Sequence, residues 1–329
     1  MSEKCAMIGY GSWATALVRQ LNRSGAGAVR WLVTNPDVRE GIVSEGRNPK
    51  YLRDVSLDTS GIELCSTVDD AVRGSDVVFL CCPSAYLQKT LDPLTVSLEG
   101  KLIVSAIKGI VPDSCETVLE YIHHRYGIPM SQLGLISGPT HAEEVSCDRT
   151  SYICAAASDL STAERIKSLI ASPSLKVDTV TDLYGLEYAG VLKNIYAIVS
   201  GICTGLGYGD NFRAVLVSAA AREMRTFLAT FCPGDRDCEG DPYLGDLLVT
   251  CYSEFSRNRR LGQLIGRGCS VKSALNEMTM VAEGYFSSAL VHRIVSDRGL
   301  DFPIAGFAWN VLYNGLSPRR GIEKLKNLL

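Results

Sequence analysis

The sequence predicts a doubly wound, mainly parallel α/β domain followed by an all-helical domain. Over the first 180 or so residues, short β-rich runs alternate with segments of helical length and periodicity. Several runs are apolar throughout, as expected of strands that are covered on both faces. No convincing strand follows Leu183. Because 329 residues also exceed the usual size of a single core, we expect two domains, at 1–182 and 183–329.

The first domain is expected to contain eight strands, each a short run rich in apolar residues. They are Cys5–Gly9, Val29–Val33, Ile62–Cys65, Val77–Cys82, Leu102–Ile107, Leu133–Ser137, Tyr152–Ala157 and Leu175–Thr179. The intervening segments have helical length and periodicity, as in Trp13–Arg23, Ala85–Leu98 and Cys115–Arg125. The second domain is expected to contain six helical segments: Leu186–Gly201, Asn211–Phe231, Leu244–Arg257, Val271–Asn276, Val281–Arg298 and Ala305–Asn314.

The composition is that of an ordinary soluble globular protein, and the lack of a signal-like or membrane-spanning segment leads us to expect it in the cytoplasm. Hydrophobic residues make up 46% and charged residues 21%, and the formal net charge of −3 disfavours a broad nucleic-acid surface. The chain opens without a signal-like segment. No apolar stretch approaches the ~20 residues that a membrane helix needs, so we expect no membrane insertion.

The twelve cysteines are scattered and form no CxxC pair, so we interpret them mostly as buried thiols in a reducing compartment. Cys232 and Cys238 lie in the polar loop "CPGDRDCEGD", where a redox or metal role is conceivable but not favoured. The sequence contains no HExxH motif, no His/Cys cluster and no GxSxG motif. We therefore expect no metal site and no catalytic triad.

The stretch "AMIGYGSWATALVRQL" places Gly9, Gly11 and Ala14 between a strand and a helix. This GxGxxA spacing is typical of dinucleotide binding: the first glycine permits a tight turn, and the second lets a pyrophosphate approach the backbone. Ala14 keeps the helix close to the strand, and the helix N-terminus offers free N–H groups to the phosphates. The alternative interpretation is a tight turn that binds nothing.

The end of the second strand, "VRWLVTNPD", does not decide between NAD and NADP. Thr34 and Asn35 stand where an acidic residue would hold the ribose hydroxyls of NAD, and Asp37 comes late. No arginine is well placed for a 2′-phosphate, since Arg30 begins the strand and Arg39 lies beyond it. The expected cofactor is therefore NAD or NADP.

Lys193 is the strongest candidate for a proton-transfer group. It is the one lysine in the apolar helical stretch "EYAGVLKNIYAIVSGI", and Ala189, Gly190 and Ala197 share its face. A lysine in such a stripe can have a lowered pKa and exchange a proton with a ligand. The alternative is an ammonium that reaches solvent at the end of its aliphatic stem.

Further candidates follow strands or end helices. Lys108 ends the strand of "KLIVSAIKGI", and Gly138 and Thr140 end the strand of "LISGPTH", at the edge where doubly wound sheets bind ligands. Asp246 shares a helix face with Thr250. That helix ends in Ser256, Arg257 and Asn258, a set of donors that suits a phosphate. The alternatives there are a solvated basic helix end and a weak nucleic-acid patch.

Seven blocks in the same order identify a family resemblance. The blocks are "GYGSWATAL", "NPKYL", "SAIKGI", "SGPTHAEEV", "GVLKNIYAIVSGI", "GDLLVTCYSEFSRNRRLG" and "VAEGYFSS". With them the chain resembles the bacterial-type NAD(P)-dependent glycerol-3-phosphate dehydrogenases. The resemblance implies an N-terminal Rossmann domain, a helical C-terminal domain with a substrate cleft between the two, and a homodimer. It also implies reversible hydride transfer between dihydroxyacetone phosphate and sn-glycerol 3-phosphate, which supplies phospholipid synthesis.

The resemblance also assigns residues. The proton-transfer lysine of the family matches Lys193, and its second substrate lysine matches Lys108. The family's other substrate contacts match Gly138, Thr140, Asp246, Ser256, Arg257 and Asn258. Its cofactor contacts match Ser12, Trp13, Lys108, Ala142, Arg257, Val281 and Glu283.

The chain departs from the family pattern at three places. Ala14 replaces the third glycine of the fingerprint, no basic residue is evident at the end of the second strand, and the loop of Cys232 and Cys238 is long. Two other functions stay open. A β-hydroxyacid or 6-phosphogluconate-like dehydrogenase would lack the "SRN" phosphate block, and a non-catalytic dinucleotide sensor would lack the proton donors Lys193 and Lys108.

Overall fold

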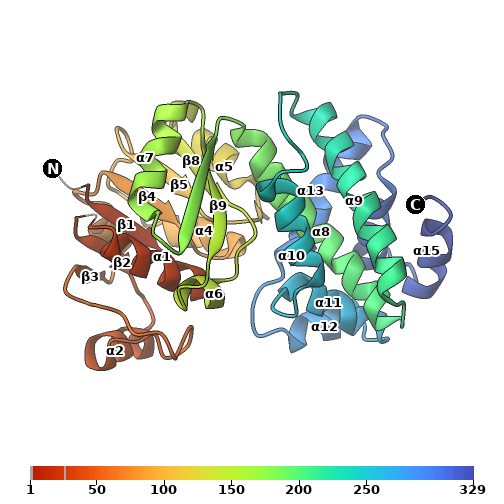
Figure 1. Ribbon diagram of the computed structural model, residues 1–329, viewed down its shortest axis with the longest axis horizontal. Helices are drawn as coiled ribbons and strands as arrows, with labels where there is room; N and C mark the ends of the chain where they lie inside the picture. Colours follow the sequence, from red (N-terminus) through yellow and green to blue (C-terminus); the bar gives the residue numbers. More distant parts are fainter. Residues whose placement is uncertain (1–2, 26) are drawn as a thin grey trace. The chain divides into compact units, whose positions relative to one another are not determined.

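The computed structural model describes residues 3–25 and 27–329, which form two compact units (Figure 1). The first unit comprises Met1–Ile107 and Val118–Leu183, and the second comprises Lys108–Thr117 and Tyr184–Leu329. The division expected at residue 182 had left Lys108–Thr117 in the first domain. In the structure this segment holds a small antiparallel pair, β6 (Ile110–Val111) and β7 (Glu116–Thr117), and β6 packs on helix α13 (Glu283–Asp297) of the second unit.

The first unit is built on one eight-stranded sheet, which confirms the predicted mainly parallel architecture. Its strands, in spatial order, are β10 (Leu175–Val180), β9 (Ser151–Ala157), β8 (Leu133–Ser137), β5 (Leu102–Ser105), β4 (Val77–Leu80), β1 (Cys5–Ile8), β2 (Val29–Leu32) and β3 (Ile62–Cys65). All neighbours are parallel except β8 and β9. The strands β9 and β10 therefore run against the other six.

Seven helices of the first unit accompany these strands: α1 (Ser12–Arg23), α2 (Pro36–Glu45), α3 (Val68–Val72), α4 (Ser84–Leu91), α5 (Val118–Tyr126), α6 (Ala142–Ser146) and α7 (Leu160–Ile170). The predicted helix Ala85–Leu98 was too long, because Pro93 has no backbone N–H group with which to continue the helix beyond Asp92. The predicted helix Cys115–Arg125 began too early. Cys115 has a left-handed backbone with φ of 55°, and the residues after it form β7.

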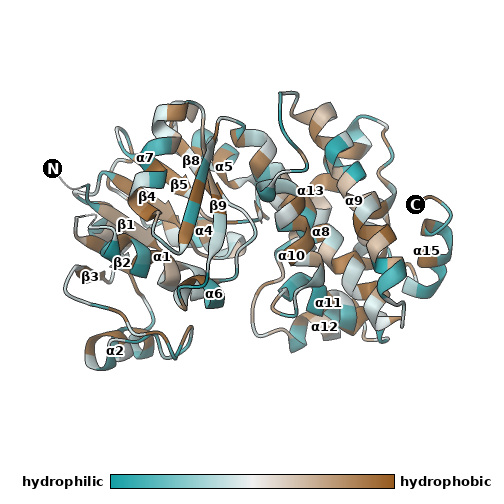
Figure 2. Cartoon of the chain, viewed as in Figure 1, coloured by the Kyte–Doolittle hydropathy of each residue, from teal (hydrophilic) through white to brown (hydrophobic). Residues whose placement is uncertain are grey.

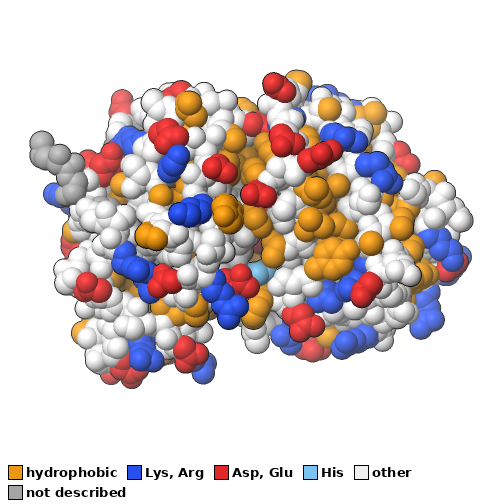
Figure 3. All heavy atoms as spheres, in the orientation of Figure 1, with side chains coloured by type: hydrophobic (Ala, Val, Ile, Leu, Met, Phe, Trp, Pro, Cys, Tyr) orange, Lys and Arg blue, Asp and Glu red, His pale blue; other side chains and the backbone are white. Residues whose placement is uncertain are grey.

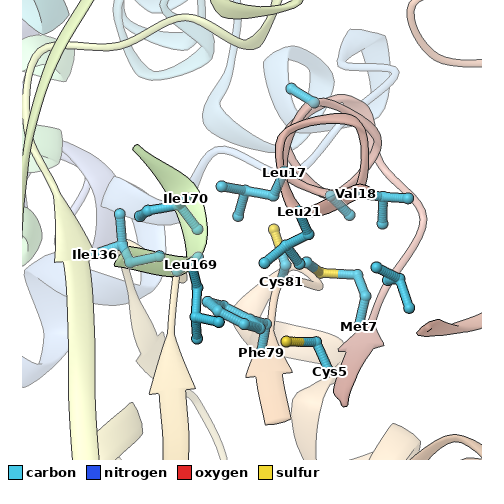
Figure 4. Packing of buried hydrophobic residues seen from close by; sticks show 14 of the residues in the cluster. Cys5, Met7, Leu17, Val18, Leu21, Phe79, Cys81, Ile136, Leu169 and Ile170 are labelled. Carbon is cyan, nitrogen blue, oxygen red and sulfur yellow. The ribbon is translucent and has the colours of Figure 1, made fainter. Parts of the chain in front are cut away.

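The core of the first unit fixes α1 on the sheet. Leu17 and Leu21 of α1 face Met7 of β1 and Phe79 of β4, and all four are fully buried (Figure 4). The central strands β4, β5 and β8 are strongly hydrophobic in Figure 2, as expected of strands covered on both faces. This packing holds the start of α1 at the carboxyl end of β1.

The second unit is helical from Tyr184 onward, although its first helix begins at Leu183. Its helices are α8 (Leu183–Gly205), α9 (Asp210–Phe231), α10 (Asp246–Tyr252), α11 (Arg257–Gly266), α12 (Val271–Glu277), α13, α14 (Pro303–Tyr313) and α15 (Pro318–Leu325), with a π-turn at Asp241–Gly245. The single helix predicted over Leu244–Arg257 is wrong. Ser253 and Ser256 interrupt it, since their hydroxyls accept backbone N–H groups from Phe255 (3.1 Å) and Arg259 (3.3 Å).

Helix α8 is buried along most of its length and approaches its neighbours through glycines. A Cβ atom on Gly201 would overlap the carbonyl oxygen of Arg259, and one on Gly262 would overlap that of Ile198. These contacts bring the backbones of α8 and α11 together. A Cβ atom on Gly284 of α13 would likewise meet the carbonyl group of Asn194 on α8. The positions of α11 and α13 against α8 are therefore set at backbone level.

Glu223 of α9 binds the first turn of α14. Its carboxylate accepts the backbone N–H groups of Ile304 (2.8 Å) and Ala305 (2.9 Å). The side chain is buried, and burial raises the pKa of Glu223 to about 7 although these two N–H donors oppose the rise. The folded state therefore binds this proton more tightly than the unfolded state, in which the pKa lies near 4.5.

We predict that the wild type loses stability as the pH rises through the pKa of Glu223, and that the Glu223→Gln variant does not. Because the folded-state pKa is raised, the wild type loses the contribution of Glu223 between about pH 4.5 and 7. Across this range the free energy of unfolding of the wild type should fall by about 3 kcal/mol relative to that of the variant. Each unit of pKa shift corresponds to about 1.4 kcal/mol. Urea unfolding at pH 5 and pH 8 measures it.

Glu239→Gln removes an exposed carboxylate of the same unit and is the matched control. Parallel pH curves for the wild type and Glu223→Gln would contradict the prediction.

Candidate active site

The glycine turn lies between β1 and α1, and its geometry fits a bound dinucleotide. Gly9 has a φ of 124°, and a Cβ atom there would overlap the carbonyl oxygen of Cys81, the residue that follows the neighbouring strand β4. A Cβ atom on Gly11 would meet nothing within 4 Å, so the backbone is open to a ligand at this point. No side chain caps the N-terminus of α1, which starts at Ser12 and Trp13. The turn thus offers bare backbone and uncapped N–H groups, as phosphates require.

Two buried residues that the sequence reasoning did not single out hold this turn in place. Trp31 of β2 donates its indole N–H to the carbonyl oxygen of Gly9 (2.7 Å). Asn48 donates to the carbonyl oxygen of Tyr10 (2.9 Å) and to the hydroxyl of Thr15 (2.8 Å). Its Oδ1 accepts the backbone N–H groups of the two residues that follow Pro49. Asn48 lies in the block "NPKYL", and this was the one feature of the sequence that could have identified it as a site residue.

Gly138 and Thr140, the other residues of the first unit that were predicted to bind ligand at the edge of the sheet, follow strand β8. Gly138 follows this strand with a φ of 128°, and Thr140 comes two residues later. Because β8 runs parallel to β5, β4 and β1, Gly138 and Gly9 lie at the same edge of the sheet. Three strand spacings separate them, or about 14 Å. Ala142 begins α6 and is buried, and Ala14 is fully buried in α1.

A basic residue, Lys50, lies beside the residues that follow β2, although it is distant from this strand in the sequence. The Lys50 ammonium lies 3.0 Å from an oxygen of Asp37 and donates to Asn35 Oδ1 at 3.3 Å. An acidic and a basic side chain therefore lie together just after β2, where the sequence alone predicted neither one clearly. Arg39, which follows, donates to the carbonyl oxygen of Leu64 (3.0 Å).

The second unit contains a buried cluster of two lysines and one carboxylate. Lys193 of α8 donates to Oδ1 of Asp246, the first residue of α10. Lys108 donates to Oδ2 of the same carboxylate at 3.0 Å. The side chains of Lys193 and Asp246 are 5% and 1% exposed, and that of Lys108 is 20% exposed. The alternative interpretation, in which the Lys193 ammonium reaches solvent at the end of its aliphatic stem, is therefore excluded.

The charges of the cluster shift its protonation equilibria. Burial lowers the pKa of Lys193, the positive charge of Lys108 lowers it further, and the Asp246 carboxylate opposes both. Burial acts to raise the pKa of Asp246, but the two lysines outweigh burial and hold this pKa below its usual value. The carboxylate stays ionised, so the cluster can stabilise a negative oxygen and deliver a proton from Lys193.

A chain of amides connects this cluster to α11 and α13. Asn194 donates to the carbonyl oxygen of Lys108 (2.6 Å), and Asn258 donates to Asn194 Oδ1 (2.8 Å). The N–H of Gly284 then donates to Asn258 Oδ1 at 2.9 Å. Asn194 was not among the predicted site residues. Its position next to Lys193 was the one feature of the sequence that could have identified it. Asn258, expected to contact substrate, also links three helices.

The remaining predicted residues lie at helix ends of the second unit. Ser256 caps α11, Arg257 is the first residue of that helix, and Glu283 begins α13 two residues after Val281. The hydroxyl of Thr250 donates to the carbonyl oxygen of Asp246 and does not join the cluster. The cysteines of the described chain form no disulfide, and no group of three or more His, Cys, Asp or Glu among these residues could hold a metal ion.

The glycine turn on a doubly wound sheet and the buried lysine–carboxylate cluster on a helical unit define a class: dehydrogenases that use a nicotinamide dinucleotide. The chain belongs to the NAD-dependent glycerol-3-phosphate dehydrogenase family. The sequence profile of the family's N-terminus matches residues 4–163, and that of its C-terminus matches residues 182–323.

Individual relatives agree with the family assignment. A protein of Exiguobacterium sp. named glycerol-3-phosphate dehydrogenase (NAD(P)+) is 35% identical over 97% of this chain and 94% of its own length. A protein of the same name from Chlorobium limicola is 32% identical over 97% of this chain and 96% of its own length.

Solved structures extend the comparison. A crystal structure of glycerol-3-phosphate dehydrogenase from Coxiella burnetii has a TM-score of 0.89 at 26% identity, covering 98% of both chains. A D-mandelate dehydrogenase at 15% identity and a TM-score of 0.60, covering 98% of this chain and 99% of its own, shares the fold alone. In the part of the chain that the structure describes, no helix is both long and apolar enough to cross a membrane.

We predict that Asn48→Asp weakens dinucleotide binding at least tenfold. The substitution keeps the acceptor for the following N–H groups but replaces the two donors with an oxygen that faces the carbonyl of Tyr10. The glycine turn should lose its fixed position while the shape of the residue is retained. Quenching of protein fluorescence by NADH and NADPH measures the dissociation constants. Unchanged dissociation constants for both would contradict the role given to Asn48.

Proposed function

We propose that this chain catalyses the reversible NAD(P)-dependent interconversion of dihydroxyacetone phosphate and sn-glycerol 3-phosphate, which supplies glycerol 3-phosphate for phospholipid synthesis. One observation carries the proposal: a member of this family buries Lys193 on a carboxylate that it shares with Lys108. We assign dinucleotide binding to residues 1–182 and substrate binding to 183–329, with Lys108–Thr117 added to the latter.

The mechanism follows from where charge develops. In the reductive direction, a bound reduced nicotinamide supplies a hydride to the ketone carbon. Negative charge then grows on the ketone oxygen. Lys193, as an ammonium, stabilises this oxygen and donates its proton to give the alcohol. Asp246 holds the ammonium in position, and Lys108 adds a second positive charge that lowers the pKa of Lys193 and makes the proton easier to give.

The phosphate of the substrate is assigned to the start of α11. Arg257 offers a planar set of N–H donors, and Asn258 keeps one amide N–H beyond the bond it gives to Asn194. Ser256, Gly138 and Thr140 complete the proposed substrate contacts. Binding energy from the phosphate orients the ketone for reaction, since the phosphate itself takes no part in the chemistry.

The cofactor is assigned to the glycine turn and to scattered positions on both units. The proposed contacts are Gly9, Gly11, Ser12, Trp13, Ala14, Lys108, Ala142, Arg257, Val281 and Glu283. We further propose that the protein is a cytoplasmic homodimer, which rests on the family resemblance alone.

Absorbance of the reduced nicotinamide tests the activity directly. With dihydroxyacetone phosphate, rapid oxidation of NADH or NADPH is expected, and the ratio of the two rates gives the cofactor preference. A β-hydroxyacid and 6-phosphogluconate, tested with the oxidised cofactors, should not react. Binding of both reduced cofactors without oxidation by dihydroxyacetone phosphate would overturn the proposal and favour a dinucleotide sensor.

We predict that Lys193→Ala lowers kcat by about 10³-fold, within the range expected for the loss of a general acid. The dissociation constant of NADH should stay within twofold, because Asp246 keeps Lys108 as its partner and the glycine turn is untouched. Steady-state kinetics and cofactor titration measure the two effects. Lys272→Ala, which removes an exposed lysine of the same unit, is the control. Retention of most of the turnover by Lys193→Ala would refute its role.

We predict that two neighbours shift the pH dependence of reduction in opposite directions. The wild-type kcat should fall as pH rises through the lowered pKa of Lys193, because the ammonium form is needed. Asp246→Asn removes the charge that raises this pKa, so the midpoint should move to lower pH. Lys108→Met removes a charge that lowers it, so the midpoint should move to higher pH. A purely structural role of either residue would reduce kcat without moving the midpoint.

A further inference from the structure

A second positive centre lies in the helical unit, outside the lysine cluster. Arg259, in the first turn of α11, is only 6% exposed. Its guanidinium makes no hydrogen bond or ion pair with any residue the structure describes, and its buried Nε atom has no acceptor. An unpaired charge is costly to bury, so buried arginines ordinarily have an anionic or carbonyl partner.

Arg213 of α9 is a second arginine at the same place. Its side chain is 14% exposed, and its Nε atom is also buried without an acceptor. The guanidinium lies over the ring of Tyr252, 5.2 Å from its centre, at the end of α10. Both α9 and α11 pack on α10. Burial lowers the pKa of Arg259, and the positive charge of Arg213 lowers it further.

Two acidic residues lie near this pair, but neither accepts a hydrogen bond from the buried Nε atoms. Asp210 contacts Arg213, but its own side chain is 87% exposed. Glu254 attracts Arg259 from an exposed position and forms no ion pair within the described chain. Apolar and cationic side chains lie side by side on the face that carries α10 and α11 (Figure 3). Two buried Nε–H groups are therefore left without an acceptor at this place.

We propose that Arg213 and Arg259 form an oxyanion site at the junction of α9, α10 and α11, which binds a phosphate group. Guanidinium groups match the tetrahedral oxygens of phosphate with paired N–H donors, and a shared anion removes the repulsion between the two cations. The phosphate can be the free ion or the phosphoryl group of a small metabolite.

This site is distinct from the proposed substrate site, because side chains two positions apart on a helix, as Arg257 and Arg259 are, leave it on nearly opposite sides. The backbone of Arg259 packs on Gly201 of α8, eight residues beyond Lys193. At 1.5 Å per residue, the two positions lie about 12 Å apart along the helix. An anion on Arg259 would nevertheless fix the first turn of α11, which also begins with Arg257 and Asn258. The oxyanion site is thus placed to steady the end of the helix to which substrate phosphate is assigned.

Calorimetric titration of the full chain with inorganic phosphate tests the proposal. Arg213→Gln should weaken one binding event at least tenfold, whereas Arg225→Gln, which removes an exposed arginine of the same helix, should leave it unchanged. Equal affinity in Arg213→Gln and the wild type would overturn the proposal. So would phosphate binding that is lost only in Arg257→Ala, because the ion would then occupy the substrate site alone.

Glycerol 2-phosphate separates the two sources of the anion. If it displaces inorganic phosphate from the wild type but not from Arg213→Gln, the site accepts phosphorylated metabolites. If it does not bind while inorganic phosphate does, the ligand is the free ion, and the site is equally supported.

Thermal unfolding gives an independent readout. In phosphate-free buffer, Arg259→Met keeps the aliphatic stem and removes an unpaired buried charge, so its Tm should equal or exceed that of the wild type. Added phosphate should raise the wild-type Tm more than that of the variant. A lower Tm for Arg259→Met without phosphate, together with equal gains on adding it, would contradict the proposal.

Discussion

The buried carboxylate of Asp246 is the interaction on which the helical unit and its chemistry both depend. It is 1% exposed, and it is the shared partner of two ammonium groups from distant parts of the chain. Without it, two positive charges would face each other in a poorly solvated place. With it, the cluster keeps one net positive charge, which is the electrostatic condition for stabilising an oxygen that becomes negative.

The helix that carries Lys193, the more deeply buried partner of that carboxylate, is held by backbone contacts rather than by side-chain packing alone. Glycines bring α11 and α13 directly onto α8, and the amides of Asn194 and Asn258 then bridge the narrow gaps. Fixed amides suit this purpose because they have no charge to neutralise and can both donate and accept. The first unit uses the same chemistry, since Asn48 and Trp31 hold the glycine turn by its carbonyl oxygens.

The sequence predicted the eight strands of the sheet well, and the central strands β4, β5 and β8 most clearly, because strands covered on both faces are apolar throughout. The ends differ by a residue or two where the apolar pattern continues into a turn. The helices α2, α3, α6 and α7 were not predicted individually. The site was predicted less completely, since Asn48 contacts residues 33 and 38 positions away and carries no periodic signal. Lys193 and Asp246, 53 positions apart, were brought together only by the family resemblance.

The assignment of Lys108–Thr117 to the helical unit has a topological consequence. The chain passes between the two units three times, at 107–108, 117–118 and 183–184. During synthesis, Lys108 leaves the ribosome long before Asp246 exists, so its unit can be completed only after most of the chain has been made. A protease that cuts near residue 183 would leave two fragments, each still carrying part of the helical unit. Neither half of this enzyme is therefore a self-contained module that could be exchanged by a simple fusion at one point.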